Sequence, residues 1–375
     1  MPSSNDVAEI TSAASITVTR KLSLGGLFLG GEGNAVTFTS RGALDVAGGV
    51  YVGSGATLVL DAPATVGGYF LVEGGTVTHT AIGSSGTYKI NLTVGGDMLI
   101  GDTGKISADS KGYTSGNPGP APGSGELGAA GSHGGFGAWH NSAKRKDCYG
   151  SFVAPVTYGG GGYSGNGSGG GAIKLVVAGD FQMYGTISAN GTYSQWYTAA
   201  GGSIWIKCRD LIGYGTISTT GGNGSGTDVY NGSYLLGAGG RISIEKTGSG
   251  DFAFDGVVKA YGGYDIGSQL AGQIPSGSCG TIAWIRPGQR PLVVIDNKNC
   301  TRTHCDGVQL PVVEQGDSAR TLRNLDFVVR NTGKLYISDD VTIWDLSLET
   351  ANAGLYLNGH TLTIRSRAHK DRAGL

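Results

Sequence analysis

The sequence has little of what defines several common protein classes, and each shortage excludes one of them. Proline contributes only 10 of 375 residues although glycine contributes 71, and no strict three-residue period occurs, so the chain is not collagen-like. The 27 basic and 28 acidic residues leave a formal net charge of −1, which gives no overall field attracting nucleic acid or an anionic membrane. No apolar run approaches the roughly 18 residues of a membrane span, and the N-terminus lacks a signal-peptide pattern. We therefore expect no nucleic-acid partner, no membrane span, and a chain that is a mature or excised segment of a longer protein.

Motifs for metal, nucleotide and nucleophile chemistry are also missing. The six histidines form neither H-E-x-x-H nor a zinc-spaced Cys/His pair, and neither G-x-S-x-G nor a Walker-type G-K-[ST] occurs. "GNGSGG" (165–170) has the G-x-G-x-x-G spacing, but a strand rather than a helix follows it. "GGNGSGTD" (221–228) is similar to a calcium-binding nonapeptide with its aspartate two residues late, so we favour a turn and keep Ca²⁺ as the alternative. We expect neither a metal nor a cofactor.

The five cysteines cannot all pair within the chain because their number is odd. Cys300 and Cys305, in "CTRTHC", are close enough in sequence for a possible disulfide that closes a small loop. Cys208 lies in the alternating segment "SIWIKCRD" with the parity of Ile204 and Ile206. We predict that Cys208 is a buried thiol.

One pattern recurs four times along the chain. Its copies are "GDMLIGDTGKISADSKG" (96–112), "GDFQMYGTISANG" (179–191), "RDLIGYGTISTTGG" (209–222) and "GDFAFDGVVKAYGG" (250–263). Each of the last three follows a glycine run and an alternating strand, and a further strand, "CGTIAWIRPGQ", has no matching second half. Asp180, Asp210 and Asp251 are 30 and then 41 residues apart, whereas the strand-turn-strand part keeps its length. Variation confined to loops is typical of a solenoid, in which each coil must stack on the next.

These repeats predict an all-β fold, because no segment has the apolar i, i+3, i+4 spacing of a helix. We expect a single-stranded right-handed parallel β-helix, since crossovers between parallel strands are right-handed, with long Gly-rich loops leaving one corner. The expected organisation is one solenoid domain over residues 1–375. It has short N-terminal coils (1–95), Gly-rich repeat coils (96–285) with a large insertion (113–167), and C-terminal coils (286–375). A β-sandwich or propeller is the alternative fold.

The segments "GGGAIKLVVAGDFQMYGTISANG" (169–191) and "GLYLNGHTLTIRS" (354–366) carry a family resemblance. They resemble glycine-rich right-handed β-helix proteins of bacterial surfaces, which are adhesin-like, and the resemblance is best over residues 88–285. It implies an extracellular or cell-surface solenoid concerned with glycans or attachment. It implies no catalytic residues.

Aromatic residues in the Gly-rich loops are the candidates for binding. They are Trp139, Tyr149, Tyr163, Trp196, Tyr197, Tyr230 and Tyr234. Aromatic rings stack on the apolar faces of sugars, so a row of them would suit non-catalytic binding of a polysaccharide or cell-surface glycan. The alternative is that the rings pack over the glycines and anchor loops that would otherwise lose much entropy on ordering.

A basic run in the longest loop is the best place for catalysis. The candidates are His140, Arg145, Lys146 and Tyr149. A polysaccharide lyase uses such groups to neutralise a uronate carboxylate and remove the adjacent proton, so a lyase or a glycoside hydrolase on this loop face is the second hypothesis. Asp339 and Asp340 are adjacent in a strand and point to opposite faces, so they cannot form a glycosidase pair by themselves. A virion fibre or tailspike shaft is the third hypothesis.

Overall fold

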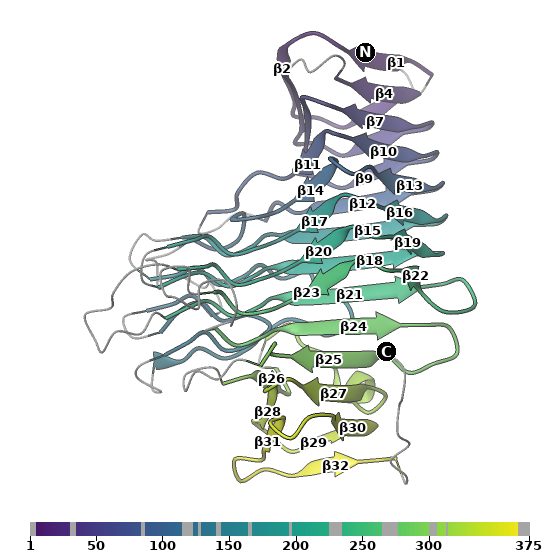
Figure 1. Cartoon of the computed structure of the whole chain (residues 1–375). Coiled ribbons are helices and arrows are strands. Elements are labelled where there is room, and N and C mark those ends of the chain that lie inside the picture. The colour runs from purple at the N-terminus through teal and green to yellow at the C-terminus, as the bar shows by residue number, and fades with distance from the viewer. Residues whose placement is uncertain are drawn as a thin grey trace.

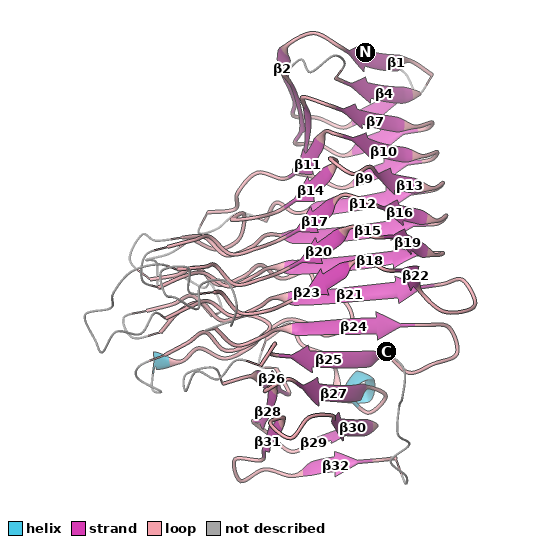
Figure 2. Ribbon diagram, in the orientation of Figure 1, coloured by secondary structure: helices cyan, strands magenta, loops and turns pink. Residues whose placement is uncertain are grey.

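Three long β-sheets run along the molecule, and the strands of each are stacked one above another (Figure 1; Figure 2). The structure is a computed structural model that describes residues 5–30, 35–83, 87–114, 123–126, 129–139, 144–163, 167–194, 197–224, 235–264, 277–299, 306–312 and 314–366.

The first sheet contains β1 (Val7–Ile10), β4 (Gly26–Leu29), β7 (Val50–Gly53), β10 (Phe70–Glu73), β13 (Met98–Ile100), β16 (Phe181–Met183), β19 (Leu211–Gly213) and β22 (Ala253–Phe254). The second contains β2 (Ala14–Val18), β5 (Val36–Ser40), β8 (Ala56–Leu60), β11 (Thr76–Thr78), β14 (Lys105–Ser107), β17 (Thr186–Ser188), β20 (Thr216–Ser218) and β23 (Val257–Lys259). The third contains β3 (Leu22–Leu24), β6 (Leu44–Val46), β9 (Ala64–Val66), β12 (Ile90–Val94), β15 (Ala172–Val177), β18 (Ser203–Cys208), β21 (Arg241–Lys246), β24 (Thr281–Ile285), β25 (Leu292–Asp296), β27 (Asp326–Arg330) and β30 (Asp345–Leu348).

The chain visits the three sheets in turn, because each strand up to β21 pairs with the strand three places later. All these pairings are parallel, and residues of one kind align across them. One inward column of the second sheet consists of Phe38, Leu58, Val77, Ile106, Ile187 and Ile217, all buried. Each such side chain removed from water contributes roughly 1.5–3 kcal/mol, so the stacked columns are the main source of stability. The predicted all-β fold with parallel strands is confirmed.

The chain does not form a single closed solenoid, because β25 runs antiparallel to β24. Beyond this reversal, further strands form two separate small sheets: β26 (Val308–Leu310), β28 (Lys334–Ile337) and β31 (Gly354–Tyr356) in one, and β29 (Val341–Ile343) and β32 (Leu362–Ile364) in the other. A short helix, α1 (Ala319–Leu322), lies between β26 and β27. The larger hydrophobic cluster, which we call the main core, includes Ile282. Ala283 on β24 and Val293, its partner on β25, belong to a separate cluster, the second core. Because adjacent strand residues point to opposite faces, the second core lies on the outward face of the third sheet.

Four Gly-rich connections leave the second sheet at one corner and return to the third sheet. They span residues 108–171, 189–202, 219–240 and 260–280 and extend to one side of the sheets (Figure 1). Gly171, Gly202, Gly240 and Gly280 stand in register directly before third-sheet strands. A Cβ on Gly240 would lie 2.0 Å from the carbonyl oxygen of Gly202, and one on Gly280 would lie 1.7 Å from that of Gly240. The glycine run before each repeat strand is therefore required by close backbone approach.

Candidate functional site

Tyr149, predicted to bind ligand or to take part in catalysis, lies inside the loop stack. Its side chain is 2% exposed, its hydroxyl donates to the carbonyl oxygen of Tyr158 at 2.7 Å, and its ring lies 4.7 Å from that of His133. Desolvation raises the pKa of the Tyr149 hydroxyl well above its ordinary value. A buried, hydrogen-bonded and protonated phenol neither stacks on a surface ligand nor serves as a base, so the structure gives Tyr149 a packing role.

Each cation of the basic run around residue 145 is paired with a carboxylate. Lys144 and Lys146 both pair with Glu126, at 3.3 and 2.9 Å. Arg145 pairs with Asp306 at 2.6 Å and lies 4.0 Å from the centroid of the Phe136 ring. Arg145 and Lys146 are therefore occupied in holding the loop, and His140 lies outside the described residues.

Trp139 takes part in the same contact between the long loop and the C-terminal sheets. Its Nε1 donates to Oδ2 of Asp306 at 2.5 Å, and the aspartate is largely buried. The hydroxyl of Tyr336 on β28 approaches the other carboxylate oxygen at 3.4 Å. Asp306 thus joins the long loop to β28.

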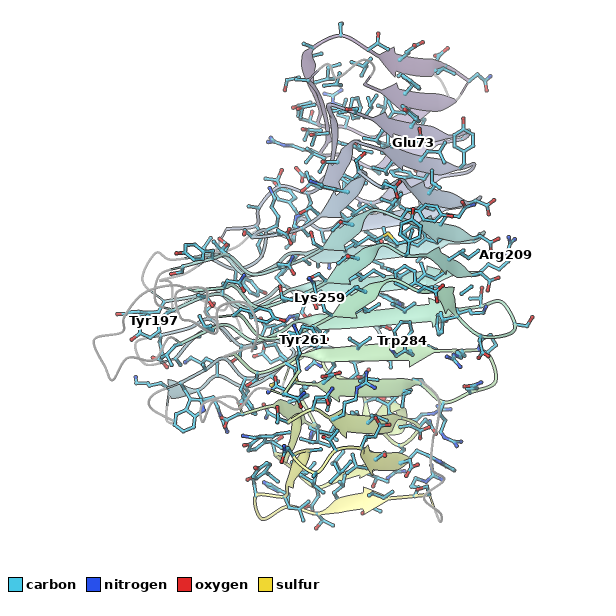
Figure 3. The ribbon with its side chains drawn as sticks, viewed as in Figure 1. Glu73, Tyr197, Arg209, Lys259, Tyr261 and Trp284 are labelled. Atoms are coloured by element: carbon cyan, nitrogen blue, oxygen red, sulfur yellow. The ribbon has the colours of Figure 1, made fainter. Side chains whose placement is uncertain are left out.

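The remaining predicted binding residues divide between packing and undescribed positions. Tyr163 and Tyr197 pack edge to face with centroids 5.4 Å apart, and Tyr197 is 7% exposed. Figure 3 shows Tyr197 among the loops, away from the three sheets. Five of the predicted positions lie outside the described residues, as does the second half (225–228) of the calcium-like phrase; they are Trp196, Tyr230, Tyr234, Cys300 and Cys305. For Tyr149 and Tyr197 the geometry agrees with the interpretation that rings anchor the loops.

Two buried polar residues that the sequence did not reveal attach the long loop to the neighbouring Gly-rich connection and to β21. His133 Nδ1 donates to the carbonyl oxygen of Gly201 at 2.7 Å and Nε2 accepts from Thr157 Oγ1 at 2.8 Å. Burial lowers the His133 pKa to about 3, so the ring is neutral. Arg241 is fully buried, and its Nε donates to the carbonyl oxygen of Tyr149 at 2.7 Å.

A cavity of about 410 Å³ opens on the outward face of the third sheet, beside the point where the second core begins. Residues of β18, β21 and β24 form its floor, and α1 with the long loop forms its walls. Its lining residues are Val153, Ala154, Trp205, Glu245, Ile285, Pro291, Arg320, Thr321, Asn324 and Leu325. We call this cavity the third-sheet groove. It contains an aromatic ring, a carboxylate, a guanidinium and an amide between apolar surfaces, a composition typical of ligand pockets.

Trp205 is the aromatic residue of the groove and points outward because its neighbours Ile204 and Ile206 point into the main core. Lys174, directly beside it on β15, places Nζ 4.6 Å from the ring centroid. The indole Nε1 is buried and has no hydrogen-bond partner among the described residues. The alternation in "SIWIK" is the sequence signal that could have identified this tryptophan as outward-facing.

Glu245 is the only carboxylate among the lining residues of the groove, and Lys207 on β18 binds it at 2.7 Å. Arg320 stands exposed on α1, which begins after Ser318, whose hydroxyl accepts the backbone N–H of Thr321. A glycosidase requires two carboxyl groups roughly 5–9.5 Å apart, so the lining supplies only half of that machinery.

The described residues contain no group of three or more His, Cys, Asp or Glu that could hold a metal ion. Within the same part of the chain, no helix is long and apolar enough to cross a membrane. No protein-family model, no curated protein and no solved structure matches the chain.

Proposed function

We propose that the three sheets are the faces of a right-handed parallel β-helix, and that this protein, extracellular or on a cell surface, binds glycans without catalysis. The regular pairing of each strand with the strand three places later supports the helical path. Right-handed connection between parallel strands is the general preference.

The observation that carries the glycan proposal is Trp205 at the floor of the third-sheet groove. An indole ring offers a flat apolar surface for the axial hydrogens of a sugar ring, and nearby polar groups hydrogen-bond its hydroxyls. Glu245, Arg320 and Asn324 supply such groups around the ring.

Binding without catalysis agrees with the state of the titratable groups. The single lining carboxylate, Glu245, is engaged by Lys207. In the long loop, Arg145 and Lys146 are engaged by Asp306 and Glu126. A glycosidase needs a pair of carboxyl groups, and Glu245 is the one carboxylate among the lining residues of the groove.

The test is a glycan array followed by calorimetry on the bound oligosaccharide, comparing the wild-type protein with Trp205→Ala and Tyr193→Ala. Tyr193 is a loop tyrosine that is 50% exposed, so it serves as a matched control for loop binding. We expect Trp205→Ala to weaken binding at least 10-fold, which corresponds to about 1.4 kcal/mol, and Tyr193→Ala to leave it unchanged. Loss of binding in Tyr193→Ala alone would move the site to the loops, and release of sugar products would refute the non-catalytic proposal.

A further inference from the structure

Two neighbouring lysines on the outward face of the third sheet have aromatic rings, not carboxylates, as partners. Lys174 on β15 lies over the Trp205 ring, and Lys89, directly before β12, places Nζ 5.9 Å from the centroid of the Tyr158 ring. Among the described residues, no carboxylate forms an ion pair with either lysine. Both side chains are half-buried.

The two lysines repel each other. The pKa of Lys89 is lowered first by burial and second by the charge of Lys174. By contrast, Lys207 is paired with Glu245 and Lys246 is paired with Asp210. The chain as a whole is almost neutral, so this surplus of positive charge is local.

A third cation belongs to the lining of the groove itself. Arg320 on α1 lines the groove, is exposed, and forms no ion pair with any described residue. Lys174 therefore lies beside the Trp205 ring and Arg320 lies elsewhere in the lining of the same groove, while the carboxylate of Glu245 is paired with Lys207. Lys174 beside the ring and Arg320 in the lining both carry a positive charge that no described carboxylate pairs with.

We infer that the ligand of the third-sheet groove is an anionic saccharide, a chain bearing carboxylate or sulfate groups. One sugar ring stacks on Trp205, and the anionic groups of the chain are attracted by Lys174 and Arg320. This inference rests on the proposed glycan-binding function and adds the chemical class of the ligand. Aromatic stacking supplies affinity for the sugar, and the lysines supply the preference for charge.

The experiment compares binding of an oligogalacturonate with that of its methyl ester, two probes that differ chiefly in charge. The wild-type protein is expected to bind the uronate at least 10-fold more tightly at low salt, with the preference falling as salt is added. A sulfated oligosaccharide and its desulfated form make a second pair that separates carboxylate from sulfate recognition. A single-stranded DNA of equal charge is the control for a nucleic-acid ligand.

Lys174→Met and Lys89→Met retain most of the apolar stems and remove the charges. We expect Lys174→Met to reduce the preference for the uronate to less than 3-fold while binding of the ester stays unchanged, and Lys174→Arg to restore the preference. Lys105→Met, at an exposed position on the second sheet, is the control that removes one charge elsewhere.

The outcomes separate the two proposals. Binding of neither member of either saccharide pair would overturn both the proposed function and this inference. Equal binding of charged and neutral forms, or a preference that survives in Lys174→Met, would overturn the inference alone. Tighter binding of the DNA than of either anionic saccharide would replace the saccharide with a nucleic acid.

Discussion

Replacing Gly240 with alanine tests whether backbone contact really sets the spacing of the coils at the loop corner. The added Cβ would lie 2.0 Å from the carbonyl oxygen of Gly202, whereas ordinary van der Waals contact begins near 3.4 Å. That oxygen accepts the backbone N–H of Arg241 at 2.9 Å, so moving it away also weakens a hydrogen bond that joins two coils. Gly280 and Gly202 stand above and below in the same column, so the strain cannot be released by a local shift.

The magnitude follows from these two effects. Overpacking of a close-packed interior costs roughly 1–3 kcal/mol, and a weakened backbone hydrogen bond costs about another 1 kcal/mol. We expect Gly240→Ala to lower the free energy of unfolding by about 2–4 kcal/mol, measured by denaturant titration with fluorescence and circular dichroism. Gly101→Ala is the matched control, because a Cβ there would meet its nearest atom at an ordinary 3.7 Å, and we expect it to change stability by less than about 1 kcal/mol. A Gly240→Ala protein as stable as the control would refute the close-contact reasoning.

Three further predictions concern the loop stack and the main core. The pKa of His133 is about 3 in the folded protein, against an ordinary value of 6.5. Between these two pH values the unfolded chain binds more protons than the folded protein. The free energy of unfolding therefore falls as the pH decreases from about 6.5. The slope is at most about 1.4 kcal/mol per pH unit, and unfolding titrations at pH 7, 6 and 5 should show a smaller slope in His133→Gln; equal slopes would contradict the assignment. Burial raises the pKa of Cys208 and of Cys148 to about 12, so mass spectrometry should find both thiols unmodified by a thiol reagent until the protein is denatured. Asp306→Asn removes a largely buried carboxylate from Trp139 and Arg145, and we expect protease cleavage within residues 129–163 to become several-fold faster; an unchanged cleavage rate would show that the loop is held by other contacts.

The sequence predicted the parallel stacking because its signal is local and repeated. Residues of one repeat unit occupy the same place in successive coils, as Asp180 before β16 and Asp210 before β19 do. The parity argument for Cys208 is also confirmed, since this residue is fully buried in the main core. Such features depend on neighbours two residues away in the strand and on one repeated spacing, both of which can be read without a structure.

The reversal after β24 has a weaker signal in the sequence. "CGTIAWIRPGQ" has no second half, and its Pro-Gly pair forms the centre of a turn in which Gly288 adopts a φ of 70°. The Gln289 N–H donates to the carbonyl oxygen of Arg286 at 3.2 Å across this turn. This turn sends β25 back beside β24 as a hairpin. A missing half-repeat followed by turn residues therefore indicates the end of the regular coils.

The orientation of the loop aromatics could not be predicted, because composition does not show whether a ring faces water or backbone. Tyr149 and Tyr193 both lie in Gly-rich loops, yet one is 2% and the other 50% exposed. The difference arises from tertiary contacts. The Tyr149 hydroxyl donates to the carbonyl oxygen of Tyr158, and the Tyr149 carbonyl oxygen accepts from Arg241 on β21, 92 residues away. Loops without a repeated register leave no pattern from which such contacts can be deduced.

The third-sheet groove exists because two covers approach the same face of the third sheet from different parts of the chain. The long loop brings Val153 and Ala154 from the regular coils, and the reversal at β24 brings Pro291 and α1 from the C-terminal part. A flat sheet surface alone offers stacking but no enclosure, and specific binding of a small group requires walls as well as a floor. The reversal that ends the regular coils therefore also supplies walls beside the outward Trp205, which the regular coils alone do not provide.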